Sequence, residues 1–84
     1  MKLIYCPHCG DVLRLYYVAR SCRRGKSGGY YRDRLNAVIS GAAIPFGFAN
    51  EDFAAALMEQ PKEGAGRLFT AFIIPKKCDT VEVI

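Results

Sequence analysis

Four cysteines are the feature that most constrains how this chain can fold. They are Cys6, Cys9, Cys22 and Cys78 in a chain of 84 residues, with the spacing C-x2-C-x12-C-x55-C. Two residues between the first pair allow one tight turn to direct both sulfur atoms at one tetrahedral metal ion. A chain this short buries only about 60–65% of its unfolded surface. A metal cross-link would therefore supply stability that a small core lacks.

The segment Cys6-Pro7-His8-Cys9-Gly10 resembles one knuckle of the zinc-ribbon and rubredoxin-like class. In this resemblance Pro7 presets the turn, and Gly10 allows a positive φ angle and leaves backbone N–H groups near the thiolates. The strand-like run after Gly10 matches the strand that leaves such a knuckle. The resemblance covers about the first 30 residues, the span that the ribbon spacing needs. It implies a zinc-ribbon-like hairpin over residues 1–32.

The second knuckle departs from the family pattern. Cys22 is followed by Arg23, Arg24 and Gly25 instead of another cysteine. Gly25 falls where a knuckle glycine could stand, so Arg24 takes a former ligand position, and an arginine cannot bind zinc. The fourth ligand is then Cys78, or His8 contributes, or the site has lost its metal and packing holds the hairpin.

Among these outcomes we expect a bound Zn²⁺ ion, because three thiolates on one hairpin would repel each other without a cation. The predicted ligands are Cys6, Cys9, Cys22 and, from the far end of the chain, Cys78.

A different interpretation uses the same cysteine pair. Cys6-Pro7-His8-Cys9 also has the spacing of thioredoxin-like thiol oxidoreductases, in which a helix N-terminus stabilises the first thiolate. Residues 2–5 would be the preceding strand, and Pro45 the proline beside the thiol pair. Gly10 and the strand-like residues 15–18 disfavour a helix there, so we expect a binding protein and not an enzyme.

Charge is distributed unevenly along the chain. Residues 1–36 carry eight basic and two acidic side chains, whereas residues 37–84 carry four basic and six acidic ones, for a net charge of +4. A basic half favours an anionic partner, either nucleic acid or an acidic protein surface. Tyrosines interleave with these cations and could stack on bases. The predicted partner-binding residues are Arg20, Arg23, Arg24, Lys26, Tyr30 and Arg32.

Hydrophobic patterning predicts a single α+β domain, in which the hairpin of residues 1–32 is followed by a short sheet with one helix. Strands are expected at 2–5, 12–20, 28–32, 67–74 and 80–84, with 67–74 in the centre of a sheet because both its faces are apolar. Residues 33–44 fit a helix or a strand. Pro45 predicts an edge strand or loop at 43–48. A helix is expected over about residues 50–60, with Asn50 as its N-cap.

These features predict a small zinc-ribbon-like binding module whose basic loop contacts nucleic acid or a complex that handles nucleic acid. One alternative is an inhibitor or adaptor that binds a protein and uses the ribbon as a scaffold. The thioredoxin-like oxidoreductase is a second alternative. No apolar run approaches the ~18 residues of a membrane span, and the N-terminal residues do not have the pattern of a secretory signal. We therefore expect a cytoplasmic protein that does not enter membranes.

Overall fold

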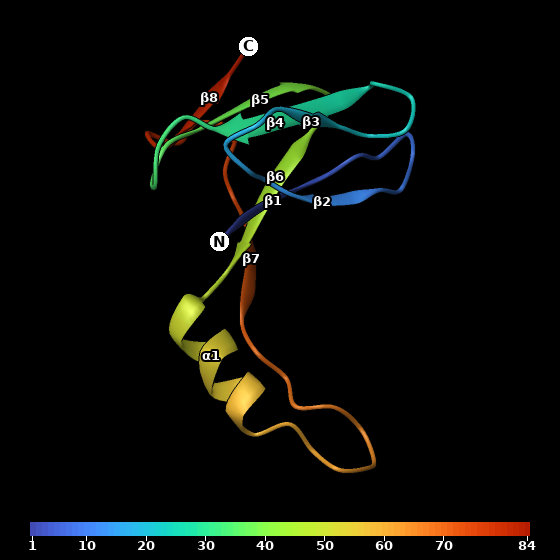
Figure 1. Cartoon of the computed structure of the whole chain (residues 1–84), viewed down its shortest axis with the longest axis vertical. Helices are drawn as coiled ribbons and strands as arrows, with labels where there is room; N and C mark the ends of the chain where they lie inside the picture. Colours follow the sequence, from blue (N-terminus) through green and yellow to red (C-terminus); the bar gives the residue numbers. More distant parts are fainter.

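The chain forms two four-stranded sheets and one helix, an α+β fold (Figure 1). The computed structural model describes residues 1–84. The first sheet has the strand order β2-β1-β6-β7, and the second has the order β3-β4-β5-β8. Its elements are β1 (Lys2–Tyr5), β2 (Val12–Arg14), β3 (Arg20–Ser21), β4 (Ser27–Tyr31), β5 (Ala37–Gly41), β6 (Ile44–Phe48), α1 (Asn50–Met58), β7 (Ala71–Ile73) and β8 (Val81–Val83).

The core lies between the two sheets, which Figure 1 shows one above the other. Ile4 of β1 and Ile39 of β5 are almost fully buried there, and each contributes roughly 1.5–3 kcal/mol by leaving water. The sheets are also joined by a hydrogen bond of 2.7 Å from the backbone N–H of Lys2 to the Tyr31 hydroxyl. The remaining core residues are Leu15, Ala37, Ile74 and Val81.

Helix α1 stands apart from the sheets, at the lower end of the molecule in Figure 1. Phe53 on the helix packs against Phe48 and Phe69, with ring centroids 5.0 and 4.9 Å away. The expected helix is confirmed, but the predicted Asn50 cap is wrong. Ala49 occupies the N-cap position, and the Asn50 side chain instead accepts a hydrogen bond of 2.9 Å from the amino group of Met1.

Two strand predictions were wrong about position in the sheet. Pro45 does not mark an edge, because β6 lies between β1 and β7. Pro45 has no backbone N–H to donate, and it lies opposite the end of β7, where the pairing of the two strands stops. Its carbonyl still accepts a hydrogen bond of 3.0 Å from the N–H of Ile74. The strand expected at 67–74 shortens to β7 and forms the sheet edge, with all three residues exposed.

The first 32 residues do not form one hairpin. The strand expected at 12–20 is interrupted after Arg14, and the chain crosses to the second sheet before β3. One hairpin therefore joins β1 to β2, and another joins β3 to β4, each in a different sheet. The ambiguous segment 33–44 contains β5, one of the two inner strands of the second sheet.

Gly41 provides a test of this packing. Its φ angle is +68°, and a Cβ atom there would overlap the carbonyl oxygen of Lys26. We expect Gly41→Ala to lower the free energy of unfolding by about 2 kcal/mol or more, since a strained φ and a backbone overlap add together. Chemical denaturation measures the change. A control is Gly66→Ala, where a Cβ meets nothing within 4 Å. Equal stability of the two variants would contradict the packing of Gly41 on Lys26.

Candidate metal centre

Two turns, one from each sheet, bring three cysteines together. Cys6 and Cys9 lie in the turn between β1 and β2, and Cys22 lies in the turn between β3 and β4. Their three sulfur atoms lie within 4.8 Å of one another, with 3.5 Å between those of Cys9 and Cys22. In Figure 1 both turns lie at the same side of the molecule. The turns therefore converge, although they belong to different sheets.

The two turns repeat one hydrogen-bond pattern. The N–H of Cys6 donates to the carbonyl of Asp11, and that of Cys22 donates to the carbonyl of Ser27, both at 2.9 Å. Each cysteine carbonyl accepts an N–H from a glycine with positive φ, namely Gly10 at 2.7 Å and Gly25 at 3.0 Å. This backbone favours glycine because residues with a Cβ atom are sterically strained at a positive φ angle. The repeated pattern gives both turns the form of a knuckle.

Backbone N–H groups also point at the sulfur atoms. The N–H of Cys9 lies 3.4 Å from the sulfur of Cys6, and that of Lys26 lies 3.2 Å from the sulfur of Cys22. Such donors favour the charged thiolate over the neutral thiol. The local backbone is therefore arranged to stabilise negative charge on sulfur.

The thiols differ in how readily they ionise. Burial raises the pKa of Cys9, and its hydrogen bonds with neighbouring thiols add to that rise. Burial also acts to raise the pKa of Cys22, but hydrogen bonds from the Cys9 thiol and from backbone N–H groups outweigh it and lower the pKa to about 7. The thiol of Cys22 thus loses its proton more readily than the thiol of Cys9.

The arrangement fits a thiophilic metal ion. Thiolates bound at about 2.3 Å to a tetrahedral zinc ion lie about 3.8 Å apart. The sulfur atoms of Cys9 and Cys22 are 3.5 Å apart, and all three lie within 4.8 Å of one another, so the cluster can accommodate such an ion. Cys6 and Cys22 are 1% and 4% exposed, so an ion between them would be largely shielded from water on that side. The three cysteines can hold a metal ion.

Cys78 is not part of this cluster, so its prediction as the fourth ligand was wrong. Its sulfur lies 3.4 Å from the Thr80 hydroxyl, and it lines a cavity with Lys2 and Tyr31. Lys2 begins β1 and Tyr31 ends β4, whereas the cysteine turns adjoin the opposite ends of these strands. Each strand separates the two places by about 13 Å. The error came from expecting residues 67–74 to be a central strand that ends beside the hairpin.

The structure also bears on three other predictions made for residues near the cluster. His8 is exposed and is not among the residues whose donor atoms converge. Arg24 lies in the second turn and is exposed, and it provides no ligand. The thioredoxin-like alternative requires a helix after the cysteine pair, but the chain forms a turn and then β2. The pair therefore lacks the helix N-terminus that this alternative needs.

The structure divides the predicted partner-binding residues into two groups. Arg23 already has partners within the chain. Its backbone N–H and its guanidinium contact the Asp11 carboxylate, and the guanidinium also donates to the Cys9 carbonyl at 3.0 Å. Arg32 forms an ion pair with Glu82. Tyr30 is half-buried in β4. The residues that remain exposed and form no ion pair are Arg20, Arg24 and Lys26.

Arg14 and Tyr16 were not among the predicted partner-binding residues, but both lie next to Arg20. The guanidinium of Arg14 lies 5.2 Å from the centroid of the Tyr16 ring, and that of Arg20 lies 5.0 Å from it. Arg20 also donates to the carbonyl of Arg14 at 3.0 Å. We call Arg14, Tyr16 and Arg20 the Tyr16 cluster. The interleaving of tyrosine and arginine was visible in the sequence, but the crossing between sheets that joins these residues was not.

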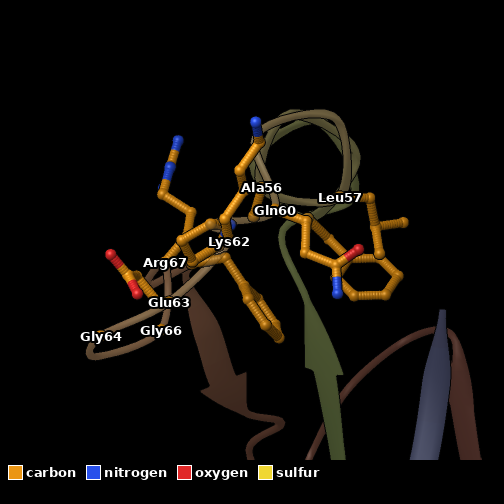
Figure 2. A pocket seen from close by; sticks show the side chains of 11 residues that line it. Ala56, Leu57, Gln60, Lys62, Glu63, Gly64, Gly66 and Arg67 are labelled. Atoms are coloured by element: carbon orange, nitrogen blue, oxygen red, sulfur yellow. The ribbon is translucent and has the colours of Figure 1, made fainter.

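The largest cavity lies elsewhere, between α1 and the loop that follows it (Figure 2). It measures about 520 Å³, and Figure 2 shows the long side chains of Gln60, Lys62 and Arg67 around it. Arg67 is held by Glu59 at 3.2 Å and by Asp52 at 3.9 Å. No cysteine or histidine lines this cavity, so it is separate from the metal centre.

Comparisons of the chain with protein-family models, with curated proteins and with solved structures give no match. The nine-residue α1 is too short to cross a membrane, and it is the only helix.

The pKa of Cys22 leads to a titration experiment. In metal-free, reduced protein, we expect one thiol to ionise with a midpoint near pH 7, because its hydrogen bonds favour the thiolate. Ultraviolet absorbance of the thiolate measures this step. The step should disappear in Cys22→Ser and persist in Cys78→Ser. A wild-type protein whose thiols all ionise above pH 8 would contradict the hydrogen-bond arrangement at Cys22.

Proposed function

We propose that this chain is a zinc-stapled binding module whose cationic surface contacts single-stranded nucleic acid. The Zn²⁺ ion would be held by Cys6, Cys9 and Cys22. The binding surface would be the Tyr16 cluster together with the exposed Arg24 and Lys26. The observation that carries the nucleic-acid proposal is the exposed Tyr16 ring, with the guanidinium groups of Arg14 and Arg20 5.2 and 5.0 Å from its centroid.

The identity of the metal is inferred from its ligands. Thiolates are soft donors and favour Zn²⁺, Cu⁺ or iron over Mg²⁺ and Ca²⁺, and zinc is the usual occupant of cysteine-rich structural sites. The four cysteines are free thiols, and a reducing compartment such as the cytoplasm keeps them so. We place the module there. The ion would tie the β1–β2 turn to the β3–β4 turn and so lock the two sheets together.

The nucleic-acid surface is inferred from charge and aromatic exposure. Tyr16 is 45% exposed, so its ring can stack on a base while Arg14 and Arg20 approach the phosphates. Base–aromatic stacking contributes about 1–3 kcal/mol per base, and the flanking cations add salt-dependent attraction. Arg24 and Lys26 lie in the turn that follows β3, on the chain segment that begins with Arg20. Asp11, the acidic residue that contacts this turn, is already paired with Arg23.

Zinc content tests the first part of the proposal. Protein purified without chelator should contain about one Zn²⁺ per chain. Cys9→Ser should lose the ion, whereas Cys78→Ser should keep it, because Cys78 lies outside the cluster. At free Zn²⁺ about 1,000 times the dissociation constant, the ion should add about 4 kcal/mol to the free energy of unfolding. Elemental analysis and denaturation with and without chelator measure both effects. Equal zinc loss in the two variants would rule out this ligand set.

Oligonucleotide binding tests the second part. We expect the triple variant Arg20→Gln, Arg24→Gln, Lys26→Gln to bind a labelled single strand at least about tenfold more weakly at low salt. The slope of log K against log salt should fall by about 2, since each lost phosphate contact on a single strand removes about 0.7. Fluorescence anisotropy over a salt series gives both values.

A matched control removes the same charge elsewhere. Lys62, Lys76 and Lys77 are exposed, and their replacement by glutamine also removes three positive charges. This control should keep the wild-type slope. If both triple variants lose the same affinity, the attraction comes from net charge and not from the proposed surface.

The protein-binding adaptor is the second candidate function, and one observation favours it. Strand β7 lies at an edge of its sheet, with Phe72 and Ile73 50% and 69% exposed. An exposed apolar edge can pair with a strand of another protein. Binding of a protein at this edge would depend little on salt, whereas binding of nucleic acid to the cationic surface would weaken steeply as salt rises. The salt dependence of binding therefore separates the two functions.

A further inference from the structure

The cysteine cluster supplies three donor atoms, one fewer than zinc usually binds. Zinc in a closed structural site has four ligands, whereas a site with three protein ligands leaves a position for another molecule. No fourth histidine, cysteine or carboxylate lies with the three sulfurs. Asp11 is the nearest acidic residue along the chain, and its carboxylate is held by the backbone N–H of Arg23 at 3.0 Å.

The surface around the cluster leaves room for an incoming group. Each turn carries a glycine, Gly10 and Gly25, and a Cβ atom built at either would meet nothing within 4 Å. Cys9 is only partly buried, in contrast to Cys6 and Cys22. The cluster is therefore closed on its inner side and approachable beside Cys9.

Charge selects the kind of ligand that would enter. A Zn²⁺ ion with three thiolates has a net charge of about −1. Three cations, Arg23, Arg24 and Lys26, lie in the second turn, and Asp11 offsets one of them. Arg23 is held against the cluster, because it donates to the carbonyl of Cys9 at 3.0 Å. The surroundings thus remain positive and favour an anionic ligand, and a metal centre rich in thiolate favours a soft donor.

We propose that the three-cysteine centre is an open metal site that takes a thiolate from outside the two turns as its fourth ligand. This inference rests on the proposed zinc site. The incoming thiol loses its proton to solvent, its sulfur donates an electron pair to the ion, and nothing is oxidised or reduced. The thiolate can come from a small thiol or from a cysteine of a second copy of this chain.

Cobalt substitution tests the proposal in the full-length wild-type protein. Co²⁺ can replace Zn²⁺ at such sites and reports thiolate ligands by charge-transfer absorption. Titration with glutathione should raise this absorption to saturation, by about one third as three thiolates become four. If the cobalt protein shows strong thiolate bands that change neither with glutathione nor with protein concentration, the open position is ruled out. If no thiolate bands form, the proposed zinc site itself is wrong.

Two variants sharpen the result. His8→Ala should respond to glutathione as the wild type does, because His8 does not belong to the cluster. If glutathione raises the absorption of His8→Ala but not that of the wild type, His8 occupies the fourth position and the inference is overturned. Without added thiol, a rise in absorption with protein concentration that is lost in Cys78→Ser identifies a second copy as the source. A rise that needs glutathione in both proteins identifies a small thiol.

Discussion

The convergence of two turns on one point is the constraint on which the rest of the molecule depends. Cys6 follows β1 in the first sheet, and Cys22 follows β3 in the second. Their sulfur atoms meet with that of Cys9 within 4.8 Å. Three thiolates so close together repel one another unless a cation lies between them. A metal ion bound by the cluster would act as a cross-link between the two sheets at one edge of a small core.

The same convergence shapes the surface around it. The hydrogen bond from the Cys22 N–H to Ser27 closes the second turn and leaves Arg24 and Lys26 exposed. The hydrogen bond from Ala42 to the carbonyl of Lys26 ties this turn to the end of β5. A change that loosens the turn would therefore affect metal binding and the cationic surface together. Stability and the proposed recognition are coupled through one short segment.

Helix α1 and its loop form a less integrated region. Contacts among three phenylalanine rings and the ion pairs of Arg67 hold the helix to β6 and to the segment that precedes β7, but much of its apolar surface stays in water. Leu57 and Met58 are exposed, as are Leu68 and Phe72 nearby in the chain. Exposed ion pairs contribute only about 0–1 kcal/mol each. We expect this region to open more readily than the two sheets, because few buried groups oppose local unfolding.

Much of the local structure followed from the sequence, since it depends on neighbouring residues. The spacing of Cys6 and Cys9, the glycine after them, the strand at 2–5 and the helix near 50–58 all express short-range rules of geometry and burial. Grouping Cys22 with the first pair was also a correct expectation, because the three sulfur atoms lie within 4.8 Å of one another.

Long-range placement was decided only by the tertiary structure. The chain crosses between the sheets after Arg14, and this crossing brings Arg14 and Arg20 to the Tyr16 ring. The strand at 67–74 was apolar on both faces and so suggested a central position, yet β7 is an edge strand, and Cys78 lies far from the other thiols. Alternation along a strand specifies which faces are apolar but not which neighbour pairs with it. Pairing is set by the competition among all strands for the same core, and no local pattern encodes that competition.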